Sequence, residues 1–210
     1  IAVLWTVLSL AVALTLGPWG FVAALFGLAL AWAYSAPPLR LKRNGWWGNA
    51  ACGICYEGLA WVTGAIVMAG GSLPDGRSLA LAALYSLGAH GIMTLNDFKS
   101  VEGDRRMGIG SLPVRLGEEQ AAHMACWMMA APQFVVVVLL MSWQARGHAL
   151  AVGALLAVQL LLMRRFVADP HGRATWYSGL GVTLYVSGML VSAVAVRAAA
   201  WMLSTLVFCS

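Results

Sequence analysis

The longest polar stretch of the sequence contains residue types that can bind a metal ion. It reads NDFKSVEGDRRMGIGSLPV, from Asn96 to Val114, and places three carboxylates close together: Asp97, Glu102 and Asp104. Clustered carboxylates repel one another unless a cation or protons neutralise them. Such hard oxygen ligands suit Mg²⁺, which typically takes one or two carboxylates and completes its coordination with substrate phosphates. The stretch therefore predicts a site for a magnesium diphosphate.

Helical spacing would bring two of these carboxylates onto one face. If the preceding helix continued through the stretch, Asp97 and Asp104 would lie within about 20° of each other around the helix axis. Glu102 would point elsewhere unless Gly103 bent the backbone toward the pair. We therefore predict Asp97 and Asp104 as catalytic metal ligands and Glu102 as a further ligand.

A second polar segment, YSAPPLRLKR, offers cations for the phosphate oxygens of such a ligand. It contributes Arg40, Lys42 and Arg43 to the predicted diphosphate site. The acidic stretch itself adds Asn96, Lys99 and Arg105. The alternative is that both segments are solvated connectors whose charges pair with one another and do no chemistry.

The rest of the chain is too apolar for a soluble domain. Of its 210 residues, 61% are hydrophobic and 10% are charged, whereas soluble domains carry about a quarter charged residues. The composition predicts an all-α polytopic membrane bundle, with residues 1–210 forming a single domain. The net charge of +5 is expected to set membrane orientation, and no basic tail or groove-reading motif points to nucleic acid.

Apolar runs of the length needed to cross a bilayer predict seven helices. These are residues 1–16, 19–34, 47–69, 78–95, 120–142, 148–163 and 175–196. Lysine and arginine concentrate in the connections after the second, fourth and sixth runs. By the positive-inside rule these connections are cytoplasmic. The acidic stretch and the YSAPPLRLKR segment should therefore share the cytoplasmic face.

Two ionisable residues lie inside predicted spans. Glu57 sits near mid-membrane, where a carboxyl group is by default a functional candidate. His90 precedes Asp97 by seven positions and so is expected on its stripe, about 10 Å deeper. Both could instead be hydrogen-bonded packing residues. Cys52 and Cys55 form a CxxC pair, but without a second pair inside an apolar helix they are read as packing cysteines.

The polar segments resemble those of a known family. The stretch NDFKSVEGDRRMGIGSLPV is similar to the second acidic motif of the UbiA-type membrane prenyltransferases, in their chlorophyll and bacteriochlorophyll synthase branch. YSAPPLRLK and CYEGLAWVTG resemble further segments of that branch. The resemblance covers the whole chain. Ser100 replaces the aspartate that the wider superfamily usually carries there, which matches this branch.

The resemblance implies a nine-helix fold of which this chain supplies helices three to nine. About two N-terminal helices, with a first acidic motif, would precede Ile1. It also implies Mg²⁺ as cofactor, and a geranylgeranyl or phytyl diphosphate as donor. The acceptor would be the propionate of bacteriochlorophyllide, in a pocket containing Glu57, His90 and Tyr34. The implied location is a bacterial inner, photosynthetic membrane, with other pigment-synthesis or photosystem assembly proteins as possible partners.

Other readings stay open from the sequence. Within the enzyme class, the acceptor could be chlorophyllide, a quinone precursor or haem. A transporter or proton relay would expect several intramembrane ionisable residues and an inverted repeat, whereas only Glu57 and His90 stand out. A pigment-binding assembly factor is a third class. The choice between phytyl and geranylgeranyl, and the oligomeric state, do not follow from the sequence.

Overall fold

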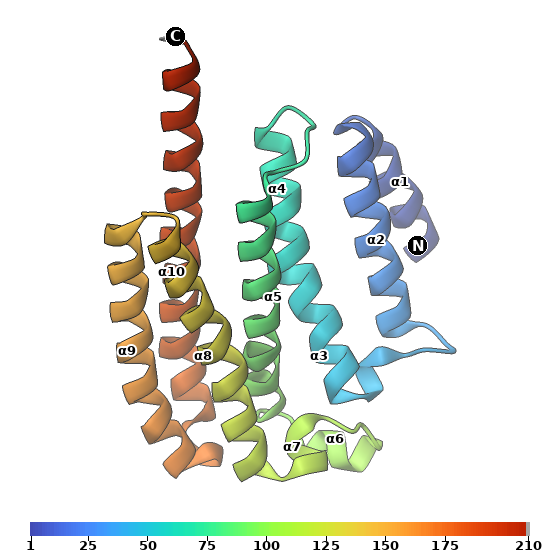
Figure 1. The fold of residues 1–210 in the computed structure, drawn as a ribbon. Coiled ribbons are helices and arrows are strands. Elements are labelled where there is room, and N and C mark those ends of the chain that lie inside the picture. Colours follow the sequence, from blue (N-terminus) through green and yellow to red (C-terminus); the bar gives the residue numbers. More distant parts are fainter. Residues whose placement is uncertain (209–210) are drawn as a thin grey trace.

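The protein is described by a computed structural model that covers the backbone of residues 1–208 and the side chains of residues 1–197. Within that part of the chain every regular element is a helix, as predicted (Figure 1). The elements are α1 (Ala2–Leu14), α2 (Gly17–Ser35), η1 (Leu41–Arg43), α3 (Gly45–Gly53), η2 (Ile54–Leu59), α4 (Ala60–Met68), α5 (Gly76–Asp97), α6 (Val101–Met107), α7 (Leu112–Leu116), α8 (Glu118–Ser142), α9 (Arg146–Ala168) and α10 (Pro170–Phe208).

Six of these segments are long and apolar enough to cross a membrane. One of them, Gly45–Met68, is built from α3, η2 and α4 in succession, where η2 is a π-helix. The first predicted span corresponds to α1, which has 13 residues and is shorter than the other six. The other predicted spans agree with the structure to within a few residues, except that α10 begins earlier and ends later. The chain is an integral membrane protein.

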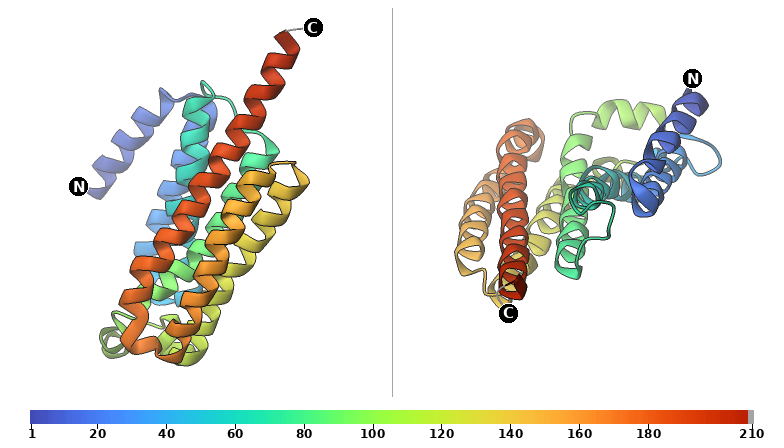
Figure 2. Two further views of the ribbon diagram at one scale, coloured as in Figure 1. Left: turned by 90° about the vertical axis from the view of Figure 1, so that its left-hand side faces the viewer. Right: turned by 90° about the horizontal axis from the view of Figure 1, so that it is seen from above.

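Helix α5 occupies the middle of the bundle. In its most apolar stretch 61% of the residues are buried inside the protein, which is the largest share among the six spans. The α3–η2–α4 span packs on one side of it and α8 on the other, with α9 and α10 beyond (Figure 1). Seen from above, α9 and α10 lie at one end of the molecule and α1 and α2 at the other (Figure 2).

Buried tyrosines join α5 to α10 deep in the bundle. The Tyr185 hydroxyl donates to the backbone oxygen of Tyr85 at 2.8 Å, and the Tyr85 hydroxyl lies 2.8 Å from Ser192 Oγ. In an apolar medium such bonds satisfy polar groups that would otherwise be costly to bury. They fix the orientation of α5, whose C-terminal end carries Asp97.

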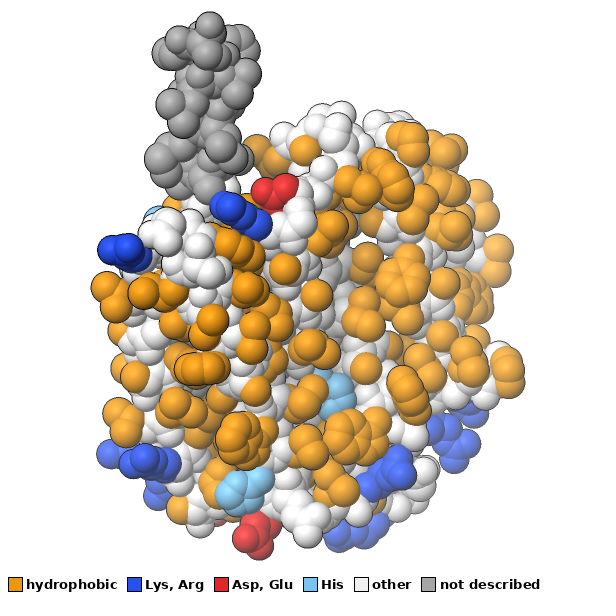
Figure 3. All heavy atoms as spheres, viewed as in Figure 1, with side chains coloured by type: hydrophobic (Ala, Val, Ile, Leu, Met, Phe, Trp, Pro, Cys, Tyr) orange, Lys and Arg blue, Asp and Glu red, His pale blue; other side chains and the backbone are white. Residues whose placement is uncertain are grey.

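The charged side chains divide unequally between the two ends of the bundle. The end of the bundle that holds α6 and α7 contains ten of the 13 lysines and arginines, and the other end contains Arg77, Arg146 and Arg197. In Figure 3 the end that holds α6 and α7 is the lower edge, where basic side chains gather, and a broad hydrophobic surface lies above it. The two polar segments therefore emerge at the same, basic end.

Candidate functional site

The two predicted loops are joined by their backbones. Gly110 N donates to the carbonyl of Arg43 at 3.0 Å, and Gly45 N donates to the carbonyl of Gly110 at 2.8 Å. Asn44 and Gly110 form a parallel β-bridge. Asn44 also caps α3, because its side-chain oxygen accepts from the backbone of Trp46 at 3.0 Å. This pairing fixes the basic loop beside the acidic one.

The continuous helix predicted through the acidic stretch is wrong. Helix α5 ends at Asp97, a turn follows, and α6 begins at Val101. Phe98 turns inward instead, is 5% exposed and packs edge-on against Phe166 with ring centroids 5.6 Å apart. The stripe from His90 through Asp97 therefore does not extend to Asp104. The turn nevertheless leaves Asp97 and Asp104 near enough for their charges to interact.

Each of the two aspartates has partners that fix its position. Asp97 accepts from the amide of Asn49 at 2.9 Å and from the backbone of Leu112. The amide of Asn49 also reaches Thr94 Oγ1 at 3.3 Å. Asp104 is 7% exposed, and one of its oxygens accepts from Ser100 Oγ at 2.9 Å. Hydrogen-bonded carboxylates of this kind are pre-oriented ligands for a metal ion.

Glu102 lies apart from this pair. Its carboxylate is paired with Arg106 Nε at 3.0 Å and Arg105 at 3.4 Å on the exposed side of α6. Gly103 stays inside a regular helix and does not redirect it. Among the described residues no group of three or more His, Cys, Asp or Glu side chains is arranged to hold a metal. The predicted third carboxylate ligand is therefore not assembled with the other two.

The predicted cations fall into two sets. Arg40, Lys42 and Arg43 are exposed, and none has a carboxylate within 4.0 Å among the side chains described. Arg40 adopts a left-handed backbone conformation, φ 42°, which turns the chain into η1. By contrast, Arg105 is held by Glu102, and Lys99 donates to Asn96 at 3.2 Å. The η1 loop therefore supplies three cations that no described carboxylate neutralises.

The three residues predicted for an acceptor pocket have different surroundings. Tyr34 hydrogen-bonds to Cys52 and lies near Asp97. Glu57 is half-buried in the π-helix η2, on the side of Tyr185. His90 is 5% exposed, and its Nε2 lies 3.2 Å from the carbonyl oxygen of Trp46. Neither of the cavities described below is lined by all three, and a pocket that they share stays a prediction. Tyr34 is the member that belongs to the surroundings of Asp97.

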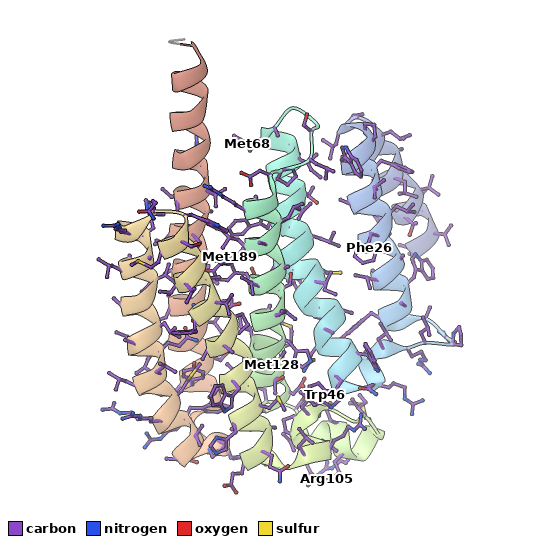
Figure 4. The ribbon with its side chains drawn as sticks, viewed as in Figure 1. Phe26, Trp46, Met68, Arg105, Met128 and Met189 are labelled. Atoms are coloured by element: carbon purple, nitrogen blue, oxygen red, sulfur yellow. The ribbon has the colours of Figure 1, made fainter. Side chains whose placement is uncertain are left out.

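Several residues important for this geometry carry no sequence prediction. Asn49 is a polar residue inside an apolar span, which by itself marks a functional candidate. Trp46 and Arg115 line a cavity together with His90 and Met128. Figure 4 shows Trp46 and Met128 close together above α6, with Arg105 at the basic end. Cys52 and Cys55, which do carry a sequence prediction as packing cysteines, are free thiols.

Comparison with known proteins agrees with this architecture. Residues 1–180 match the UbiA prenyltransferase family. The chain is 56% identical over 197 residues to the Bacteriochlorophyll synthase 33 kDa chain of Cereibacter sphaeroides, covering 94% of this chain and 65% of that protein. It is 40% identical over 176 residues to the chloroplastic Chlorophyll synthase of Avena sativa, covering 83% of this chain and 46% of that protein.

A solved structure of digeranylgeranylglyceryl phosphate synthase has the same fold. The TM-score is 0.74 at 17% identity, over 92% of this chain and 67% of that one. The chain spans about two thirds of the length of its bacterial relatives, 65% and 66% for the two from Cereibacter sphaeroides and Rhodobacter capsulatus. With a family match over residues 1–180 and an all-helical bundle of matching topology, the chain belongs to the UbiA prenyltransferase family.

Proposed function

We propose that this protein transfers a geranylgeranyl or phytyl group from its diphosphate to the propionate of bacteriochlorophyllide. Relatives at 56% and 50% identity are named bacteriochlorophyll synthase. The observation that carries the proposal is the backbone pairing of Arg43 and Gly45 with Gly110. It sets the unpaired cations of the η1 loop beside the hydrogen-bonded Asp97 and Asp104, which is the charge pattern that a metal diphosphate requires.

We assign the metal to Asp97 and Asp104, and propose Mg²⁺ as the ion. The two residues fit a hard divalent cation because both offer carboxylate oxygens whose orientation is fixed by Asn49 and Ser100. When bound, such an ion stabilises the negative charge that develops on a leaving diphosphate. Arg40, Lys42 and Arg43 would contact the remaining phosphate oxygens.

The reaction requires no general base. The bond between the prenyl carbon and the diphosphate oxygen breaks, and its electron pair leaves with the diphosphate. An oxygen of the propionate, already anionic near neutrality, forms the new bond to that carbon. No proton is transferred, so the residues of the site act by binding, by orienting and by stabilising charge. The apolar bundle above the site keeps water from the allylic cation.

The basic end of the bundle is proposed to face the cytoplasm of a photosynthetic bacterium. Ten of the 13 lysines and arginines lie there, which is the distribution that the positive-inside rule associates with the cytoplasmic side. Both substrates would then be delivered from that side.

Reconstitution tests the proposal directly. The full-length protein in nanodiscs, given Mg²⁺, geranylgeranyl or phytyl diphosphate and bacteriochlorophyllide, is expected to yield esterified pigment and diphosphate in equal amounts. Chelation of divalent ions should stop the reaction, and added Mg²⁺ should restore it. Formation of product at an undiminished rate with the metal removed would contradict the metal assignment. Pigment binding without product, or solute flux in proteoliposomes, would favour an assembly factor or a transporter.

Asn49 is expected to act as a positioning residue. Asn49→Leu removes the amide that holds Asp97. The affinity for Mg²⁺ should fall by about 10–100-fold, the usual loss when the hydrogen-bond partner of a metal ligand is removed. The measurement is the Mg²⁺ concentration for half-maximal turnover. Asn49→Gln, which keeps an amide, should recover part of the loss. If Asn49→Leu lowers turnover at saturating metal without shifting that concentration, its role is structural.

A further inference from the structure

A groove runs along the α3–η2–α4 span, α5 and α8, from Leu79 near the start of α5 to the basic end. Its inner part is an apolar cavity of about 480 Å³, a size suited to a small-molecule ligand. Small residues form much of the wall, among them Ala50, Gly58 and Ala83. At the basic end a second cavity of about 470 Å³ adjoins it. The two share Ala50, His90 and Met128.

The groove is apolar inside and cationic at its mouth. Trp46, Trp47 and Arg115 line only the second cavity, next to the loops. Arg115 is exposed, and no carboxylate lies within 4.0 Å of it among the side chains described. A ligand that fills this space should therefore be a largely apolar molecule with one anionic group at the loop end.

The groove and the aspartate site lie on different faces of α3. Trp46 and Ala50 line the groove, whereas Asn49 and Cys52 face Asp97 and Tyr34. These two pairs are separated by about 100° around the helix. Between the two faces α3 packs directly on α5, because a Cβ on Gly53 would come within 2.8 Å of the Ser86 carbonyl oxygen.

At the basic end, however, the groove and the aspartate site are close neighbours. The backbone of Leu112 donates to Asp97, and Arg115 lies three residues later on the same short helix, α7. Three residues correspond to about 4.5 Å along a helix. An anionic group held at Arg115 would therefore approach the place where the metal diphosphate is proposed to bind.

His90 lines both cavities, and one of its ring nitrogens has no hydrogen-bond partner. Its Nε2 must carry the proton, because the carbonyl oxygen of Trp46 at 3.2 Å can only accept. Nδ1 is then an unprotonated acceptor, and it has no partner although it is buried. An unprotonated imidazole nitrogen is a common metal ligand. Met128 is the flexible side chain beside it that could move as a ligand enters.

We propose that this groove is the binding site of the acceptor, a magnesium tetrapyrrole that bears a carboxylate. The macrocycle lies along the apolar wall, its magnesium takes His90 as axial ligand, and its propionate pairs with Arg115 at the end next to Asp97. The proposal rests on the proposed function for the identity of the acceptor. It explains together the apolar lining, the unpartnered imidazole nitrogen and the unpaired arginine.

The experiment compares two pigments in the absence of any prenyl donor. The full-length protein in nanodiscs is titrated with bacteriochlorophyllide and with its magnesium-free counterpart, and binding is followed by pigment absorption and fluorescence. The wild type should bind the magnesium form about tenfold more tightly. His90→Leu should lose that preference while keeping its affinity for the metal-free pigment. A preference that persists in His90→Leu overturns the assignment of the axial ligand.

Two further variants test the groove itself. Arg115→Gln should lower the affinity for both pigment acids about tenfold and leave the affinity for their methyl esters unchanged. Arg165→Gln, an exposed arginine at the same end, is the matched control. Ala83→Trp places a large side chain in the groove from an exposed position and should lower the affinity for both pigments. Unchanged affinity in Ala83→Trp, or complete displacement of the pigment from the wild type by phosphatidylglycerol, would assign the groove to bilayer lipid instead.

Failure of this inference can be told apart from failure of the proposed function. If esterification proceeds normally in His90→Leu and Ala83→Trp, the acceptor binds elsewhere and the prenyl transfer stands. If the wild type neither binds nor esterifies the pigment, the proposed acceptor itself is wrong.

Discussion

Replacement of Asp97 or Asp104 by asparagine is expected to lower prenyl transfer by about 10³-fold or more. Each change keeps the size of the side chain and removes one anionic ligand of the proposed metal ion. A bound metal contributes several kcal/mol of charge stabilisation in the transition state, and each 1.4 kcal/mol corresponds to about tenfold in rate. Turnover of the reconstituted full-length protein, measured as esterified pigment, checks this result.

Two other carboxylates serve as comparisons for this prediction. Glu102→Gln should stay within about threefold of the wild type, because the exposed pairs of Glu102 with Arg105 and Arg106 contribute little. Glu119→Gln changes an exposed carboxylate at the start of α8 and should have no effect. Full activity in both aspartate variants would refute the site. An equally large loss in Glu102→Gln would restore Glu102 as a metal ligand.

The fold was predictable because long apolar runs leave few choices. A backbone in hydrocarbon must satisfy its hydrogen bonds internally, so apolar segments become helices. The predicted span 120–142 matches α8, Glu118–Ser142, on this basis. The π-helix Ile54–Leu59 was not predictable, since it depends on how α3 and α4 pack against α5. A hydropathy profile does not distinguish a π-helix from an α-helix.

The site was predictable as two loops on one face, and less so in its internal geometry. Charge counting correctly placed the η1 loop and the acidic stretch at the same end. The helical spacing of Asp97 and Asp104 was the wrong reason for their proximity, because burial of Phe98 against Phe166 breaks the helix between them. The role of Asn49 depends on a contact 48 residues distant in the chain. Nothing local in the sequence reports such a contact.

The junction of the two loops also depends on one residue that has no side chain. A Cβ on Gly45 would come within 2.6 Å of the Leu112 backbone nitrogen and 2.9 Å of the Ser111 carbonyl carbon. Both are backbone atoms, which cannot move aside as a flexible side chain would. Gly45 also donates to Gly110 at 2.8 Å, in the pairing that holds the loops together. The position therefore couples the packing of α3 to the placement of Asp97, which accepts from Leu112.

Gly45→Ala is accordingly expected to impair both stability and turnover. Overpacking against backbone should destabilise the protein by about 1–3 kcal/mol, measured as a lower unfolding temperature in nanodiscs. Displacement of Leu112 removes a hydrogen bond from Asp97, so turnover should fall about tenfold or more even well below that temperature, with a higher Mg²⁺ requirement. Gly103→Ala is the matched control, because nothing lies within 4 Å of a Cβ there and alanine favours the helix. Unchanged turnover and stability in Gly45→Ala would show that the two loops need not stay joined for the site to work.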